Sequence, residues 1–175
     1  MPKLILKYTA SALFALLISS NLFANPTHSV GVGVVNTSAD VLDITSPGIV
    51  YEYRSSDALA VEIGLYFGGS DAISSGSVGA GVEINSIAST KLKYGGASGN
   101  MKYYVFGGYT NIDVDSLACG YGSCFALSDS AGGFTAGVGV DFDLGENWIV
   151  GGQYAAGFDD IDETDCLGLS LLYKF

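Results

Sequence analysis

Residues 134–158 read FTAGVGVDFDLGENWIVGGQYAAGF and hold two alternating segments separated by a short polar link. Every second residue from Phe134 to Phe142 is apolar, and the positions between them are Thr, Gly or Asp. The same alternation returns after residues 144–147, from Trp148 onward. Strict alternation predicts half-buried β-strands, and the turn-like link predicts that the two strands are antiparallel neighbours.

A period of two recurs in six further segments: residues 29–37, 48–54, 59–68, 78–94, 101–112 and 166–175. The segment 59–68, LAVEIGLYFG, is the clearest of them. In the segment 78–94 the alternation weakens over residues 85–89, which indicates a β-bulge. Both faces of the segment 101–112 carry aromatic residues, so the pattern leaves open which face points inward.

The links between the eight segments alternate in length. Residues 55–58, 95–100 and 144–147 form short, turn-like links, whereas the other four are mostly longer and more acidic: residues 38–47, 69–77, 113–132 and 159–165. An even number of strands, with short turns at one end and longer loops at the other, is typical of bacterial outer-membrane barrels. The predicted fold is all-β, an eight-stranded antiparallel transmembrane β-barrel.

Glycine and aromatic residues fit the same prediction. Eight strands leave an interior just wide enough for side chains to fill it, so glycines opposite the apolar positions are expected to face inward: Gly31, Gly33, Gly64, Gly79, Gly81, Gly137, Gly139 and Gly168. Aromatic residues gather at segment ends, where an interfacial belt would place them: Tyr51, Tyr53, Phe67, Tyr94, Phe142, Trp148, Phe158, Tyr173 and Phe175.

The first residues are typical of a secretory signal. Lys3 and Lys7 precede a short apolar stretch at residues 12–18, and cleavage is expected after Ala24. The domains are therefore a signal peptide, 1–24, and a barrel domain, 25–175. The mature part loses two basic residues and keeps five against 18 acidic ones, a net charge of −13. Its three cysteines would lie in an oxidising compartment.

Composition narrows the function classes. Hydrophobic residues make up 49% of the chain and charged residues 14%, which is too apolar for an ordinary soluble domain and excludes a disordered chain. Five basic residues cannot neutralise many phosphates, so we expect no nucleic-acid partner. Gly, Asp and Ser interrupt the apolar runs after the first thirty residues, which argues against membrane-spanning helices.

Three stretches resemble a known group of proteins. Residues 104–109 (YVFGGY), residues 136–142 with 148–154 (AGVGVDF and WIVGGQY), and residues 171–175 (LLYKF) are similar to the small outer-membrane barrels of the OmpA type, the OmpX- and OmpW-like barrels and the opacity-type surface proteins. Leu171, Tyr173 and Phe175 resemble the terminal signal that the barrel-assembly machinery reads. The resemblance implies the outer membrane of a Gram-negative envelope, contact with its lipid and lipopolysaccharide, and a monomer.

Charged residues on the inward side of the segments should meet inside the barrel, because charges in a narrow lumen need partners. The candidates for these lumen charges are Glu52, Arg54, Glu62, Glu83, Lys91, Lys93, Asp141 and Lys174. The favoured interpretation is a plug of ion pairs, and the alternative is a gated or very small pore.

The predicted loops are acidic, which polarises the molecule along its axis. The densest run supplies weak candidates for a divalent cation site: Asp159, Asp160, Asp162, Glu163 and Asp165. This run lacks the spacing of an EF-hand loop, and simple solvation of the loop is the favoured interpretation. No metal site is therefore predicted.

Cysteine and histidine complete the candidates. Cys119 and Cys124 flank GYGS, a spacing that closes a small ring, so we expect a disulfide there, with a zinc site as the alternative. Cys166 is left over, either free or displacing one partner. The sole histidine, His28, lies near the mature N-terminus, at the periplasmic end of the first segment, which faces the wrong leaflet for lipid A chemistry. Without a histidine, a serine nucleophile lacks its usual base. We expect no catalytic residue, no enzymatic activity and no cofactor.

The predicted function is structural or surface-interaction, adhesion-like, with the acidic loops contacting an extracellular ligand. One alternative is a narrow porin-like conduit for small or apolar solutes. A second alternative is a soluble lipocalin-type ligand carrier, which would reverse the pattern by placing apolar residues inside and polar residues outside.

Overall fold

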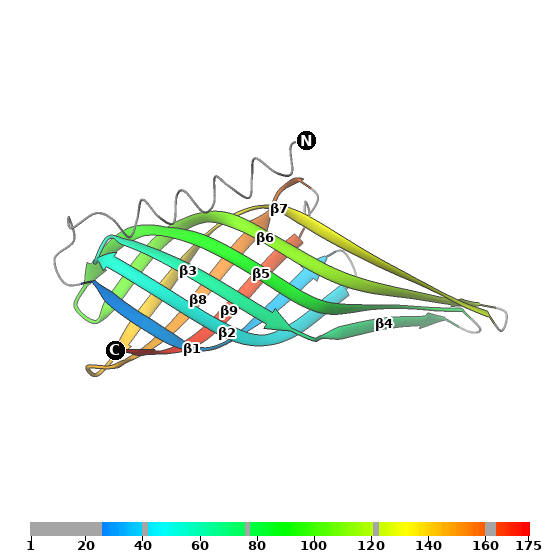
Figure 1. Cartoon of the computed structure of the whole chain (residues 1–175), viewed down its shortest axis with the longest axis horizontal. Coiled ribbons are helices and arrows are strands. Elements are labelled where there is room, and N and C mark those ends of the chain that lie inside the picture. The colour runs from blue at the N-terminus through cyan, green and yellow to red at the C-terminus, as the bar shows by residue number, and fades with distance from the viewer. Residues whose placement is uncertain (1–25, 40–41, 76–77, 121–122, 160–163) are drawn as a thin grey trace.

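The computed structural model describes residues 26–39, 42–75, 78–120, 123–159 and 164–175 (Figure 1). The predicted signal peptide therefore lies outside the described residues. Nine antiparallel strands make up almost all of the described chain: β1 (Thr27–Ala39), β2 (Leu42–Ser56), β3 (Leu59–Phe67), β4 (Ser70–Ser75), β5 (Val78–Ser98), β6 (Met101–Gly120), β7 (Ser123–Leu144), β8 (Trp148–Gly157) and β9 (Thr164–Lys174). Within the described ranges, no helix has the length and apolar character needed to cross a membrane.

Eight of the strands close into a barrel. The sheet runs in the order β3-β2-β1-β9-β8-β7-β6-β5-β4, and an additional pairing between β3 and β5 closes the first eight of these strands into a ring. The ring leaves out β4, whose one partner strand among the described residues is β5. In a closed ring, the backbone amides and carbonyls of every strand hydrogen-bond to the two neighbouring strands. A lipid environment requires this arrangement of a β-protein. The predicted eight-stranded antiparallel barrel is confirmed.

A pair of glycines separates β3 from β4. Gly68 and Gly69 have φ angles of +70° and +111°, which side chains rarely adopt. A Cβ atom at Gly69 would also lie 2.7 Å from both Ile44 Cγ2 and the Thr45 carbonyl oxygen. Only glycine fits this bend, and the bend directs β4 away from the barrel wall.

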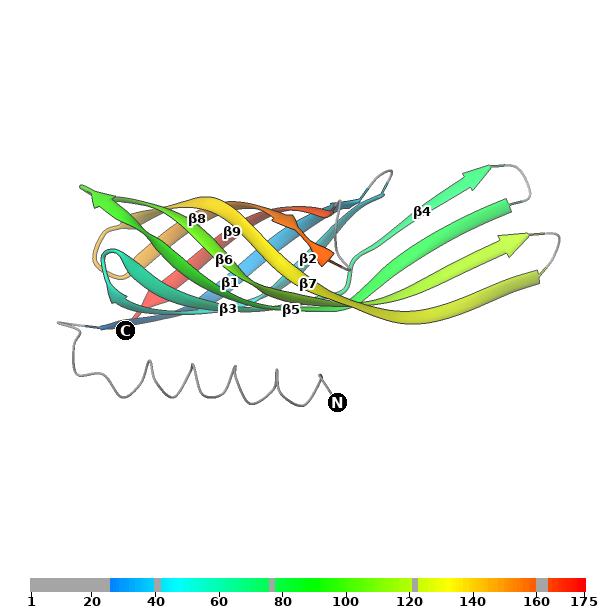
Figure 2. The same ribbon diagram turned by 90° about the horizontal axis from the view of Figure 1, so that it is seen from above.

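Beyond the barrel, four strands continue as a sheet, which Figure 2 shows projecting from one end. We call it the extension and define it as β4 with residues 78–84 of β5, 114–120 of β6 and 123–129 of β7. Among the described residues, nearly all of 69–77 and 113–132 and most of 38–47 are strand, so the prediction of loops was wrong there. Ser, Gly and Asp in these segments are typical of turns, but cross-strand pairing satisfies their backbone and keeps the strands going.

The predicted bulge is confirmed within residues 85–89, and it changes which side chains face inward. The register of β5 against β6 shifts between Ile84 and Ser86, so the alternation before and after Asn85 is out of phase. Ile84 is buried with 3% exposure, and Glu83 is exposed on the opposite face. The inward assignment of Glu83, together with Gly79 and Gly81 on the same face, was therefore wrong.

The outer wall of the barrel is apolar. Val32, Val138 and Leu169 have 55–61% of their surface exposed, although polar side chains fill much of the interior. Aromatic contacts ring both ends, as with Trp148 and Tyr173 near the short turns, whose ring centroids lie 5.1 Å apart. This distribution is opposite to that of a soluble lipocalin-type carrier, so that alternative has no support in the fold.

The interior fits large side chains against glycine. Tyr104 and Phe106 of β6 point inward with 7% and 4% exposure, which settles the orientation that the sequence left open. A Cβ atom at Gly139 would lie 2.5 Å from the Tyr104 ring, and one at Gly137 would lie 2.6 Å from Phe106. The inward glycines of β7 therefore provide the space that the two aromatic rings occupy.

Candidate functional site

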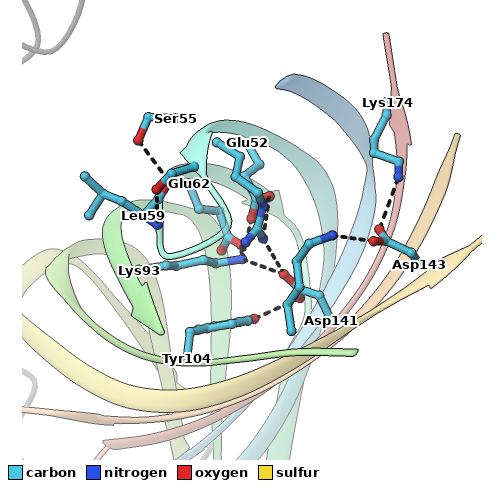
Figure 3. Close-up of polar contacts among 12 residues, drawn as sticks. Glu52, Ser55, Leu59, Glu62, Lys93, Tyr104, Asp141, Asp143 and Lys174 are labelled. Carbon is cyan, nitrogen blue, oxygen red and sulfur yellow. Dashed lines mark hydrogen bonds and ion pairs between the residues drawn. The ribbon is translucent and has the colours of Figure 1, made fainter. Parts of the chain in front are cut away.

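Three cations and three carboxylates meet inside the barrel (Figure 3). Arg54 Nη2 lies 2.9 Å from Glu52 Oε1 and 2.8 Å from Asp141 Oδ2. Lys93 Nζ lies 2.8 Å from Glu52 Oε2 and 2.5 Å from Glu62 Oε2. Lys91 completes the set by pairing with Glu62 at 3.1 Å. We call these six residues the ion network.

Cross-strand geometry explains why the ion network needs Lys93. Glu52 of β2 and Glu62 of β3 are direct neighbours in the antiparallel register, and like charges in such positions repel each other. The ammonium group of Lys93 contacts both carboxylates. Because all three side chains are at most 3% exposed, water contributes little to screening the repulsion between the two carboxylates.

Uncharged groups complete the coordination. The Tyr104 hydroxyl donates to Asp141 Oδ1 at 3.1 Å, and Gln153 Nε2 donates to Glu62 Oε1 at 3.2 Å. Lys93 Nζ also lies 4.5 Å from the centroid of the Tyr104 ring, within the range of a cation–π contact. The ion network is thus neutral in total and hydrogen-bonded on several sides, which is the condition under which buried charges are tolerated.

A second polar group lies near the short turns. Lys102 and Lys174 both pair with Asp143, the latter at 3.2 Å. A cavity of about 460 Å³ opens at this end of the barrel and is lined by Arg54, Lys102 and Lys174 among others. The cavity reaches the ion network at Arg54, whose side chain is 9% exposed.

The opposite half of the interior is built mainly of apolar side chains, with a few buried serine and threonine hydroxyl groups among them. One buried cluster contains Val35, Ile44, Tyr66, Ile87 and Ile112, each at most 8% exposed. Cys166 packs against this cluster, and its sulfur lies 3.8 Å from the Thr37 hydroxyl. Side chains therefore fill the barrel on both sides of the ion network. Toward the turns they are ion pairs and two apolar residues of the same cluster, Ile149 and Leu172. Toward the extension they are apolar side chains with small hydroxyl groups among them.

The extension has its own chemistry. It carries four carboxylates, and the sequence places no Lys, Arg or His in its ranges: Asp71, Glu83, Asp115 and Asp129. A hollow of about 610 Å³ lies across its strands, with Asp71, Glu83 and Asp115 in its lining. Hydrogen bonds from the side chains of Ser128 and Asn85 lower the pKa of Asp115, so this carboxylate stays ionised at neutral pH.

A disulfide joins the far end of the extension. Cys119 of β6 and Cys124 of β7 are directly opposite in the register, with Cα atoms 4.1 Å apart. Cys166 is free and lies inside the barrel, away from this pair. The bridge therefore ties β6 to β7 beyond the membrane-facing wall, where only cross-strand contacts hold the two strands together.

The structure brings together six of the eight predicted lumen charges. Lys174 lies apart with Asp143 at the turn end, and Glu83 lies on the extension. Sequence reasoning missed Tyr104, Gln153 and Lys102 as partners. Lys102 lies on the same face of its strand as Tyr104, and Asp143 lies on the same face as Asp141. Assigning the inward face of residues 101–112 would therefore have predicted Tyr104 and Lys102 as interior partners.

Two further predicted sites have defined surroundings. His28 accepts or donates a hydrogen bond with the Tyr51 hydroxyl at 2.8 Å and packs against Tyr53 and Phe175. His28 therefore belongs to the belt of aromatic side chains on the outer wall, at the end of the barrel with the short turns. For the weak cation candidates, residues 160–163 lie outside the described residues, and the described part of the chain contains no group of three metal-ligating side chains.

Comparison with solved structures supports the same fold. The attachment invasion locus protein Ail of Yersinia pestis matches with a TM-score of 0.56 and 12% identity, over 88% of this chain and 100% of that one. A second structure of Ail, in complex with the heparin analogue sucrose octasulfate, matches with a TM-score of 0.54 and 13% identity, over 86% and 97% of the two chains. The N-terminal barrel of OprF from Pseudomonas aeruginosa matches with a TM-score of 0.54 and 13% identity, over 84% and 97%.

These identities are low, so the likeness concerns the fold. A comparison with curated protein sequences gives no significant match. The family described as "Outer membrane protein beta-barrel domain" matches residues 9–175. This match covers nearly the whole chain and agrees with the closed ring, the apolar wall and the aromatic belts. The chain belongs to the outer-membrane β-barrel family.

Proposed function

We propose that this protein is a surface-interaction barrel: a closed membrane anchor that presents the extension to an extracellular ligand. The observation that carries the proposal is the contrast between the two halves of the molecule. The barrel interior is filled by the ion network and the apolar cluster, whereas the extension exposes Phe125 and Leu127 by 65% and 58%. Exposed apolar residues with polar residues around them are typical of interaction sites.

The orientation follows from the lengths of the connections. Short turns at residues 57–58, 99–100 and 145–147 would face the periplasm, and the extension would face the outside, as in bacterial barrels generally. Export through the signal peptide and insertion by the barrel-assembly machinery at Leu171, Tyr173 and Phe175 belong to the same proposal. The belt of aromatic residues nearest the extension would then lie at the lipopolysaccharide leaflet.

The charge of the extension decides which class of ligand it favours. One solved structure similar to this chain holds a heparin analogue, sucrose octasulfate. The extension here has four carboxylates and no basic residue, so a polyanionic ligand would be repelled. We therefore propose a cationic or neutral ligand for this protein, not a sulfated sugar.

The second candidate function is a narrow conduit. The cavity of about 460 Å³ at the turn end favours it, because solute could enter the barrel from that side. It meets Arg54 and the ion network, whose carboxylates are 1–3% exposed. Passage would require these contacts to break, so the closed barrel is the favoured state.

Catalysis is not part of the proposal. The ring of His28 is engaged by Tyr51 and packed among aromatic residues on the outer face. That position supports an interfacial role for the ring, since a general base needs a nucleophile within hydrogen-bond reach.

A pair of measurements on the refolded, oxidised protein tests the proposal. Liposomes containing it should not swell in small sugars if the barrel is closed, and uptake of sugar would establish the conduit instead. Whole cells that display the protein should bind cationic polymer-coated surfaces more than cells that display a variant shortened to the barrel rim. Equal binding of the two would refute a role for the extension.

A further inference from the structure

One edge of the extension has an unpaired strand. Residues 135–144 of β7 pair with β8, and in the described part of the chain residues 123–133 have no partner on that side. The backbone amide of Phe158 donates to the Phe134 carbonyl at 2.8 Å, which marks the last contact before the edge opens. Because backbone groups alternate in direction along a strand, the amides and carbonyls of even-numbered residues point outward from this edge.

This edge lacks the usual protection against strand pairing. Natural edges are short, or carry lysine, proline or bulges, but residues 123–133 read SCFALSDSAGG and hold one charged residue, Asp129. Asp129 Oδ1 accepts the outward amide of Ser130 at 2.8 Å. On the other edge of the extension, Asp71 accepts the amide of Ala72 in the same way, also at 2.8 Å. The outward amides of Cys124, Ala126 and Ser128 carry no such cap among the described residues.

The two faces of the edge strand differ in chemistry. Phe125, Leu127 and Asp129 share one face, and the first two are more than half exposed. On the other face Ser128 lies in one cross-strand row with Asp115 and Glu83. A partner strand would therefore meet two apolar side chains and then a carboxylate on one face, and hydroxyl and acidic groups on the other.

We propose that residues 123–130 of β7 bind an extended cationic polypeptide segment as an added antiparallel strand. The added strand would run antiparallel to β7 and so meet Asp129 first and Phe125 last. It would carry a basic residue opposite Asp129, and an apolar residue opposite each of Leu127 and Phe125. Asp129 would leave the Ser130 amide and pair with the basic residue, and main-chain hydrogen bonds would supply the affinity. This inference rests on the proposed function and names its ligand.

Charge argues against a second copy of this chain as the occupant. Pairing two copies along β7 would bring together eight carboxylates from the two extensions, with no basic residue in either. The repulsion between these like charges disfavours a second copy as the partner. A segment with lysine or arginine at the stated position would instead neutralise Asp129, which lies on the same face as Phe125 and Leu127.

The test uses the full mature protein, refolded in detergent with its disulfide intact, and a short labelled peptide. The core of the peptide is lysine, threonine, valine, threonine and valine in that order, and a control peptide carries glutamate in place of lysine. Fluorescence anisotropy measures binding to the wild type, Ala126→Pro and Ala126→Ser. Proline at residue 126 removes one outward amide and leaves the backbone hydrogen bonds to β6 in place, and the edge of a sheet tolerates proline. Serine at the same position keeps the amide.

We expect Ala126→Pro to weaken binding of the lysine peptide by about tenfold or more, equivalent to ~1.4 kcal/mol, and Ala126→Ser to leave it unchanged. Asp129→Asn should bring the lysine and glutamate peptides to similar affinity. Equal binding to Ala126→Pro and the wild type, or equal binding of the two peptides to the wild type, would overturn the inference. A dimer seen by sedimentation and lost in Ala126→Pro would identify a second copy as the occupant and overturn it too.

The outcomes separate this inference from the proposed function. Heat-modifiable gel mobility confirms that each variant is folded before binding is measured. If no peptide binds while liposomes stay sealed and the extension still mediates cell attachment, strand addition fails and the surface role stands. If liposomes swell in sugar and attachment is independent of the extension, the proposed function fails.

Discussion

Lys93 of β5 and Glu52 of β2 lie 2.8 Å apart across the barrel interior, although their strands do not pair with each other. The strand between them contributes Glu62, which also contacts Lys93. One ammonium group therefore links three strands and separates two carboxylates that the register places side by side. This contact makes the interior a closed unit, and it is the part of the ion network where a single change should have the largest effect.

Replacing Lys93 by methionine should destabilise the barrel by about 3–5 kcal/mol, because the variant leaves buried carboxylates without a partner. The free energy of unfolding in urea, followed by heat-modifiable gel mobility, measures the effect. The double variant Lys93→Met with Glu52→Gln removes one charge of each sign and should recover part of the loss. Lys102→Met, at the mouth of the barrel, serves as the control. An equal loss of unfolding free energy for Lys93→Met and Lys102→Met would show that the ion network stabilises the barrel no more than the ion pairs at its mouth.

Opening the ion network should also change conductance. In planar bilayers the wild type is expected to be silent, and Arg54→Ala should produce small openings, because Arg54 separates the cavity of about 460 Å³ from the network. Lys174→Ala changes a charge at the same mouth without removing a contact to Asp141 and should remain silent. Steady conductance of the wild type would contradict a closed barrel.

Gly139 should not tolerate even a methyl group. A Cβ atom there would lie 2.5 Å from the Tyr104 ring, so Gly139→Ala should cost about 1–3 kcal/mol in the free energy of unfolding through overpacking. Gly152→Ala is the matched control, because its Cβ atom would lie 3.7 Å from Leu169 in ordinary contact. If the two alanine variants unfold at the same urea concentration, the fit between Gly139 and Tyr104 is looser than the structure indicates.

The disulfide should stabilise the extension and leave the barrel unchanged. Replacing Cys119 and Cys124 by serine is expected to speed amide exchange and protease cleavage in residues 114–129, because few contacts besides the ladder hold this end. The urea midpoint of the barrel should stay the same. Cys166→Ser provides the control, since this cysteine lies inside the barrel. A large fall in barrel stability after loss of the disulfide would mean that the extension and barrel unfold together.

The terminal residue should matter for assembly in cells more than for stability. Phe175 is 70% exposed, its amide donates to the His28 carbonyl at 2.9 Å, and its ring stacks on His28 with centroids 6.0 Å apart. Removing Phe175 should lower the amount of barrel in the outer membrane, as expected for an assembly signal, while refolding in detergent proceeds with similar yield. A parallel loss in both measurements would assign Phe175 a structural role alone.

Much of the barrel could be predicted because alternation reports on each strand separately. Val30 and Val32 face outward and Gly31 and Gly33 inward, as the period of two requires for a strand between lipid and a narrow interior. The same reasoning fails for residues 101–112, where aromatic residues occupy both faces. Tyr103 faces outward and Tyr104 inward, and the difference lies in Gly139, on the neighbouring strand, which leaves room for the Tyr104 ring.

The amino-acid sequence by itself determined the number of barrel strands, their antiparallel order, the apolar outer wall and the aromatic ends, because each follows from local periodicity and composition. The tertiary structure decided three things that periodicity does not contain. The bulge at Asn85 turned Glu83 away from the barrel interior, cross-strand pairing kept β6 and β7 extended where their residues resemble turns, and barrel closure brought Lys93 to Glu52. Each depends on contacts between residues far apart in the chain, and those contacts exist only once the strands have closed into a ring.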